Sequence, residues 1–130
     1  MNRIVLGAAL TAGVLLAGCT PAAEPEARAA AEAFQAAVSS RDLVTACGLL
    51  SDSARSSLES AVASPCAQAL GRLDLAGGEV GQVNVWGDNA QAKVGANALF
   101  LAEFTSGWKV TAAGCTFRSQ DLPYDCNVEG

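Results

Sequence analysis

The chain has 130 residues, of which 51% are apolar and 16% charged, and its formal net charge is −5. This length allows one domain with one hydrophobic core, and the composition excludes an intrinsically disordered chain. The basic residues occur singly, so no basic stripe is present that could neutralise nucleic-acid phosphates. We therefore expect no nucleic-acid partner.

The first residues have the pattern of a secretory signal. Arg3 provides a positive charge, and residues 4–16 form an apolar stretch shorter than the roughly 20 residues that a transmembrane helix needs. The stretch ends in the small-residue sequence Leu16-Ala17-Gly18-Cys19. We therefore expect a cleaved signal peptide over residues 1–18.

The residues around this cleavage site resemble the lipobox of bacterial lipoproteins at all four positions. In that family the cysteine is diacylated and the signal is removed before it, which implies that Cys19 is the lipid attachment site. The resemblance also implies an extracytoplasmic protein that is anchored to the cell membrane. Without Arg3 the chain would carry a net charge of about −6. Anionic lipids would repel this charge, so attachment would depend on the acyl chains.

A short linker follows the predicted lipid site. Residues 19–27 contain Pro21 and Pro25 and have no apolar periodicity. We interpret them as a lipidated tether, whose eight or so residues would reach roughly 25 Å when extended. A single α+β domain is expected over residues 28–130.

Four segments with helical spacing of apolar residues are expected between residues 25 and 73. Their start signals are Pro25 as a first helical residue, Asp42 and Ser51-Asp52 as caps, and Ser64-Pro65 as a cap followed by proline. The residues expected to face inward are Ala30, Phe34, Ala37, Val38, Leu43, Ala46, Cys47, Leu50, Ala54, Leu58, Ala61, Val62, Cys66, Ala69, Leu70 and Leu73.

After Gly77-Gly78 the apolar residues alternate with a period of two, which predicts strands. Strands are expected around residues 82–85, 90–97, 99–104 and 108–112. In the last of these, Trp108, Val110 and Ala112 are expected to share one face. A loop between Gly114 and Pro123 would lead to an edge strand over residues 124–129. Helices followed by an antiparallel meander predict an α+β fold with helices on one sheet face.

The five cysteines become an even set of four once Cys19 is assigned to lipid, as expected for disulfides in an oxidising compartment. Four cysteines permit three pairings. We favour Cys47–Cys66 and Cys115–Cys126, because each pair lies within one half of the domain. A metal site is disfavoured, since the chain has neither histidine nor a Cys-x-x-Cys motif.

The order of elements resembles the nuclear transport factor 2-like superfamily, in which helices pack into a curved antiparallel sheet. Residues 33–38 followed by Arg41-Asp42-Leu43 are similar to the opening helix of that superfamily and the step into its second helix. Residues 108–115 and 123–126 are similar to the ending of small actinobacterial lipoproteins. The superfamily includes isomerases, cyclases, dehydratases and non-catalytic binding or assembly modules, so the resemblance implies a fold more than an activity.

The residues themselves offer few catalytic candidates. The absence of histidine excludes a Ser-His nucleophile, and Gly77-Gly78-x-x-Gly81 precedes a strand rather than a helix, so no cofactor is expected. Four aromatic residues either line a ligand cavity inside a curved sheet or form the bulky part of a small-residue core, and one exposed tryptophan could instead form a partner patch. These residues are Trp86, Phe100, Phe104 and Trp108.

We therefore favour a non-enzymatic, lipid-anchored module that binds an envelope protein or a small apolar ligand. One alternative is a cavity enzyme of the isomerase or cyclase type with Asp88 or Glu103 as its base. A second alternative is a structural envelope component that acts as a homodimer.

Overall fold

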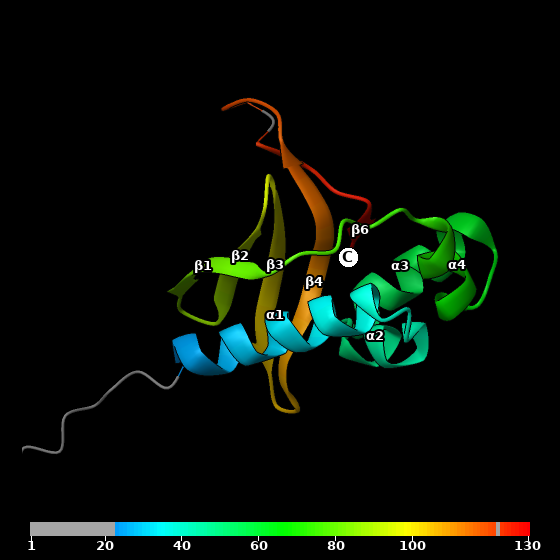
Figure 1. Cartoon of the computed structure of the whole chain (residues 1–130), viewed down its shortest axis with the longest axis horizontal. Helices are drawn as coiled ribbons and strands as arrows, with labels where there is room; N and C mark the ends of the chain where they lie inside the picture. Colours follow the sequence, from blue (N-terminus) through cyan, green and yellow to red (C-terminus); the bar gives the residue numbers. More distant parts are fainter. Residues whose placement is uncertain (1–22, 122) are drawn as a thin grey trace, which may run out of the picture.

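The computed structural model describes residues 23–121 and 123–130 and contains four helices followed by a six-stranded antiparallel sheet (Figure 1). The α+β prediction is therefore confirmed. The expected signal peptide and Cys19 lie outside the described residues. Within the described part of the chain, no helix has the length and hydrophobicity to cross a bilayer.

The helices are α1 (Ala23–Ser39), α2 (Leu43–Leu49), α3 (Asp52–Val62) and α4 (Cys66–Arg72). Two of the expected caps are present. The Asp42 carboxylate accepts a hydrogen bond from Thr45 N at the start of α2, and the Ser51 hydroxyl accepts one from Ala54 N at the start of α3. These bonds satisfy amide groups that have no partner within the first turn of a helix.

The expected cap of α4 is absent. Pro65 rather than Ser64 occupies the cap position, and its side chain makes no capping bond. The Ser64 hydroxyl instead donates to Val62 O and accepts from Arg72 Nη1. The Ser64 hydroxyl is thus bonded to Val62 and to the last residue of α4, and not to an amide of the first turn.

The first helix begins earlier than expected, at Ala23, and it includes residues that we assigned to the tether. Pro25 is tolerated there because amides in the first turn need no helical acceptor. Glu24 forms a salt bridge of 3.0 Å with Arg28 one turn later, and Ala27 is fully buried. The folded domain therefore begins before residue 28.

The strands are β1 (Val80–Trp86), β2 (Asn89–Val94), β3 (Asn97–Phe104), β4 (Gly107–Phe117), β5 (Tyr124–Asp125) and β6 (Val128–Glu129). The first four form a meander, and both β5 and β6 pair with β4. Two short strands thus replace the single edge strand expected at the C-terminal end. The other part of the β4 edge is met by the α2–α3 connection, where Ser51 N donates to Val110 O at 2.8 Å.

The core lies between the helices and one face of the sheet. In Figure 1, α1 crosses in front of the strands and α2, α3 and α4 gather beside β4. Among its fully buried side chains are Phe34, Leu70, Leu101, Val110 and Val128. Many of the other core residues are alanines. Their small side chains let the helices pack close to the sheet, but each buries little apolar area.

Several expected positions differ from the structure. Ala61 and Val62 are exposed rather than buried. The β3–β4 pairing shifts between Phe100 and Leu101, which turns Ala112 away from the face shared by Trp108 and Val110. This β-bulge breaks the period of two, because it adds a residue to one strand. Gly114 lies inside β4 rather than at the start of a loop.

Candidate functional site

Both favoured cysteine pairs form disulfides. Cys47–Cys66 joins α2 to α4 with a Cα–Cα distance of 6.1 Å, and Cys115–Cys126 joins β4 to the segment after β5 with a distance of 4.0 Å. The four thiols are thereby withdrawn from metal binding. Among residues 23–121 and 123–130, no group of three or more His, Cys, Asp or Glu side chains is placed to hold a metal ion.

The four aromatic residues expected to line a cavity lie on two faces of the sheet. Trp108 is buried in the core beneath the helices, whereas Phe100 packs on the opposite face. Trp86, at the end of β1, is 51% exposed, and Phe104, at the end of β3, is 47% exposed. The structure therefore does not bring the four side chains together.

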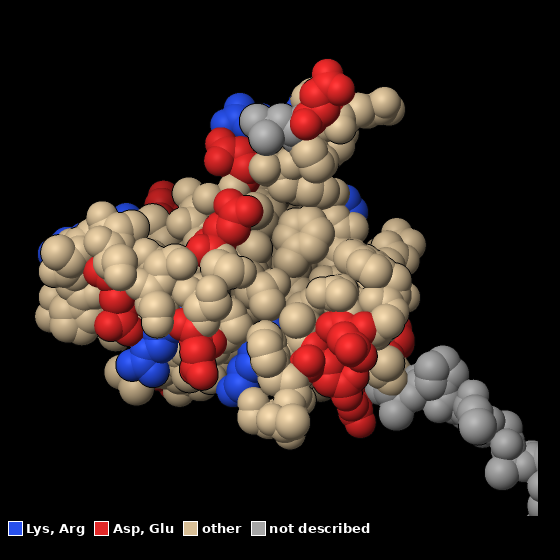
Figure 2. Space-filling view, turned by 180° about the vertical axis from the view of Figure 1, so that it is seen from behind, with Lys and Arg blue, Asp and Glu red and all other residues tan. Residues whose placement is uncertain are grey.

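The face of the sheet without helices carries an aromatic group that we did not predict as a unit. Phe100 and Phe117 both make edge contacts with Tyr124, at centroid distances of 5.0 and 5.8 Å. The Tyr124 hydroxyl also accepts a hydrogen bond of 2.6 Å from Gln91 Nε2. Seen from behind, the centre of the molecule is largely uncharged (Figure 2).

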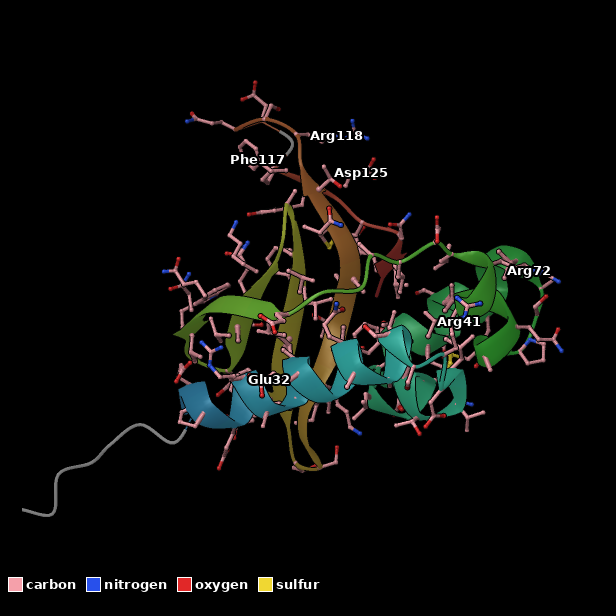
Figure 3. The ribbon with its side chains drawn as sticks, viewed as in Figure 1. Glu32, Arg41, Arg72, Phe117, Arg118 and Asp125 are labelled. Atoms are coloured by element: carbon pink, nitrogen blue, oxygen red, sulfur yellow. A yellow bond between two sulfur atoms is a disulfide. The ribbon has the colours of Figure 1, made fainter. Side chains whose placement is uncertain are left out.

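This aromatic group continues to the far end of β4. Phe117 is 57% exposed there, beside a salt bridge of 2.8 Å between Arg118 and Asp125 (Figure 3). Cys115 and Cys126 are close in the chain to these residues and hold the C-terminal segment against β4. The packing explains how a segment with only two short strands stays attached to the sheet.

The space between α1 and the sheet is almost filled. A void of about 10 Å³ remains there, lined by residues that include Phe34, Leu99 and Ala113. Such a volume accommodates about one water molecule. Asp88 and Glu103, the expected bases of a cavity enzyme, are exposed, and neither lines this void.

One surface hollow of about 620 Å³ lies between α1 and the segment that precedes β1. Its polar lining includes Glu32, which Figure 3 labels on α1. Glu79 also lines it, so the hollow has an acidic character. The buried amide of Gln35 donates to Ala76 O at 3.2 Å and to Gly78 O at 3.4 Å. Because both amide hydrogens are used in this way, Gln35 holds the segment to the helix rather than facing a ligand.

A second hollow, of about 520 Å³, lies between the α2–α3 connection and the turn that joins β3 to β4. We call it the α2–α3 hollow. Its size falls within the range of about 300–1,000 Å³ that is typical of small-molecule sites. Phe104 is the one predicted cavity residue that lines it. The full lining comprises Cys47, Gly48, Leu50, Ser51, Asp52, Ser53, Arg55, Phe104, Thr105, Ser106 and Lys109.

The charged side chains of the α2–α3 hollow differ in whether they already form a salt bridge. The Lys109 ammonium donates to Gly48 O at 3.0 Å, and within the described residues it forms no salt bridge with a carboxylate. Arg55 is paired with Glu59 at 2.9 Å. Asp52 is the single carboxylate in the lining. Since Arg55 is paired, Lys109 is the cation of the lining that is open to a further partner.

Comparisons with known proteins provide no relative from which a role could be transferred. No family model, curated protein or solved structure matches the chain. The α2–α3 hollow, with its size and its lining of Lys109 and Phe104, is the candidate site.

Proposed function

We propose that the protein is an exported lipoprotein, anchored to the cell membrane through Cys19, whose domain is a non-enzymatic binding module. The observation that carries this proposal is the pairing of Cys47 with Cys66 and of Cys115 with Cys126. Disulfides persist in oxidising compartments and are rare in the cytosol of most organisms. Cys19 is the remaining cysteine, and it follows the lipobox-like residues 16–18.

The shape of the domain supports a binding role. The α2–α3 hollow has a volume of about 520 Å³, whereas the void between α1 and the sheet has about 10 Å³. The lining of the hollow has one carboxylate, Asp52, and the whole chain lacks histidine. These residues suit recognition better than proton transfer. The element order also supports a nuclear transport factor 2-like fold, which hosts many non-catalytic modules.

The start of α1 would place the domain very close to the membrane. Ala23 is the fourth residue after Cys19, and four residues span at most about 14 Å. The α2–α3 hollow is lined by the end of α2, the start of α3 and the β3–β4 turn, and it has no lining residue from α1. An anchored domain would therefore keep this hollow away from the attachment point and open to solutes or envelope proteins.

Intact-mass analysis of the full chain tests the anchor. Expressed in a bacterium with a lipoprotein pathway, the wild type should appear in the membrane fraction, without residues 1–18 and with added acyl mass. Cys19→Ala is the matched variant and should lack that mass. Alkylation without reductant should find no free thiol in the wild type. An unprocessed N-terminus, or unpaired cysteines throughout, would refute the proposal.

A further inference from the structure

The α2–α3 hollow presents a cation with unused donors. Lys109, on β4, is partly buried, and its ammonium has three donors, of which one is bonded to Gly48 O. That bond fixes the side chain across the opening between β4 and α2. The remaining donors can therefore meet a ligand without a large loss of side-chain freedom.

The same hollow presents an apolar surface beside this cation. The register places Phe104 opposite Gly107, which has no side chain to cover the ring. Phe104 consequently stays 47% exposed although it belongs to a strand. Leu50, which is buried, adds apolar lining on the helix side. A ligand with an apolar part would remove the exposed part of the Phe104 ring from water.

The balance of charge indicates the class of ligand. Arg55 is already paired with Glu59, so Lys109 is the cation available to a ligand. A singly charged anion could pair with Lys109, whereas a phosphate with nearly two charges would be repelled more strongly by Asp52, the carboxylate of the lining. A cationic ligand would be repelled by Lys109.

We propose that the α2–α3 hollow binds a small amphipathic carboxylate, whose carboxylate group accepts hydrogen bonds from Lys109 and whose apolar chain packs on Phe104. The inference rests on the proposed binding function and specifies the chemical class of its ligand. It follows from three features that no sequence motif joins: the free donors of Lys109, the uncovered ring of Phe104, and the pairing of Arg55 with Glu59, which leaves Lys109 as the cation open to a ligand.

Octanoate, titrated below the concentration at which it aggregates, is the probe. The protein is the exported full chain with Cys19→Ser, oxidised so that both disulfides form, and the readout is the set of backbone amide NMR shifts. Saturable shifts are expected at Thr105 and Ser106, which line the hollow. Octanol should bind about fivefold more weakly, since it lacks the charge, and octylammonium should bind more weakly still. Octyl phosphate should not exceed octanoate in affinity.

Three substitutions locate the charged contact. Lys109→Gln should weaken octanoate binding about fivefold, and Lys109→Arg should restore it. Lys93→Gln is the matched control, because Lys93 is the chain's other lysine and is exposed on β2 outside the hollow. It should leave the affinity unchanged. Phe104→Ala should weaken octanoate and octanol alike, and added salt should weaken octanoate alone. The salt series keeps the test valid even where a variant folds poorly.

The proposal is overturned if octanoate and octanol bind equally, if Lys109→Gln binds as the wild type does, or if the shifts lie outside the hollow. These outcomes are separate from failure of the anchor. Unmodified Cys19 in the native protein would refute lipidation and leave an octanoate result standing. Acylated Cys19 with no octanoate shift would refute the ligand class and leave the anchor standing.

Discussion

Gly114 is a position inside the sheet where a single methyl group should have a large effect. It lies inside β4 with φ +63°, a conformation that glycine adopts without strain. A Cβ there would collide with Asn127 Oδ1 and would lie 2.9 Å from Leu75 Cδ2 and 3.1 Å from Asn127 Cβ. Asn127 is held in place because its backbone N–H donates to Ala113 O at 3.1 Å. The neighbouring Cys115–Cys126 disulfide further limits any movement.

Gly114→Ala therefore combines two costs. The left-handed backbone adds about 1–2 kcal/mol for an L residue, and overpacking adds about 1–3 kcal/mol. We expect the free energy of unfolding to fall by about 2–5 kcal/mol, a large part of the stability of a domain of this size. Gly87→Ala is the matched control, since its φ is +59° and nothing lies within 4 Å of its Cβ. It should lose about 1–2 kcal/mol from the backbone alone.

Urea unfolding of the oxidised protein, followed by tryptophan fluorescence, measures both variants. The difference between them isolates the packing contribution around Gly114, because the backbone conformation of the two positions is nearly the same. Equal losses in Gly114→Ala and Gly87→Ala would refute the close approach of Asn127 and Leu75 to β4.

Three further substitutions test separate features. Ser51→Ala removes the buried cap of α3 and should lower the free energy of unfolding by about 1 kcal/mol in urea unfolding. Gln35→Ala removes the side-chain amide that donates to Ala76 O and Gly78 O. Amide hydrogen exchange in residues 76–80 should become faster, and the free energy of unfolding should fall by about 1–3 kcal/mol. Trp86→Phe should remove most of the acrylamide-quenchable fluorescence, because Trp86 is 51% exposed and Trp108 is 7% exposed. Quenching that survives in Trp86→Phe would contradict the burial of Trp108.

Local signals were sufficient to predict the helices. The caps at Asp42 and Ser51 depend on residues three positions apart, so the sequence alone predicts them. The prediction of a cap at Ser64 was wrong: Pro65 occupies the cap position, and the serine hydroxyl bonds Val62 O and Arg72 instead. The early start of α1 was missed because the two prolines near it suggested an irregular segment.

The faces of β4 could not be predicted from alternation. Residues 111–114 read Thr-Ala-Ala-Gly, and this run has too little contrast in size and polarity to show which side faces the core. The bulge that reverses Ala112 is set by pairing with β3, which sequence spacing does not reveal. The α2–α3 hollow was missed for a similar reason. Its lining comes from residues 47–55 and 104–109, and the bond from Ser51 N to Val110 O, next to Lys109, holds these two segments together.

The two disulfides should contribute similarly to the stability of the domain but differently to the geometry of the hollow. Cys47 lines the hollow, and its bond to Cys66 fixes α2, whose Gly48 O positions Lys109. The pairs are 19 and 11 residues apart, so removing either should cost about 3 kcal/mol in the chain-entropy model.

Double alanine variants of the two pairs should therefore show similar losses in urea unfolding but different losses of octanoate affinity. Replacing Cys47 and Cys66 should weaken octanoate binding, because Lys109 loses its fixed acceptor. Replacing Cys115 and Cys126 should leave the affinity of the folded protein unchanged, since neither cysteine lines the hollow. Equal affinities in the two variants would show that the α2–α4 link does not shape the site, and the role of Gly48 in positioning Lys109 would have to be abandoned.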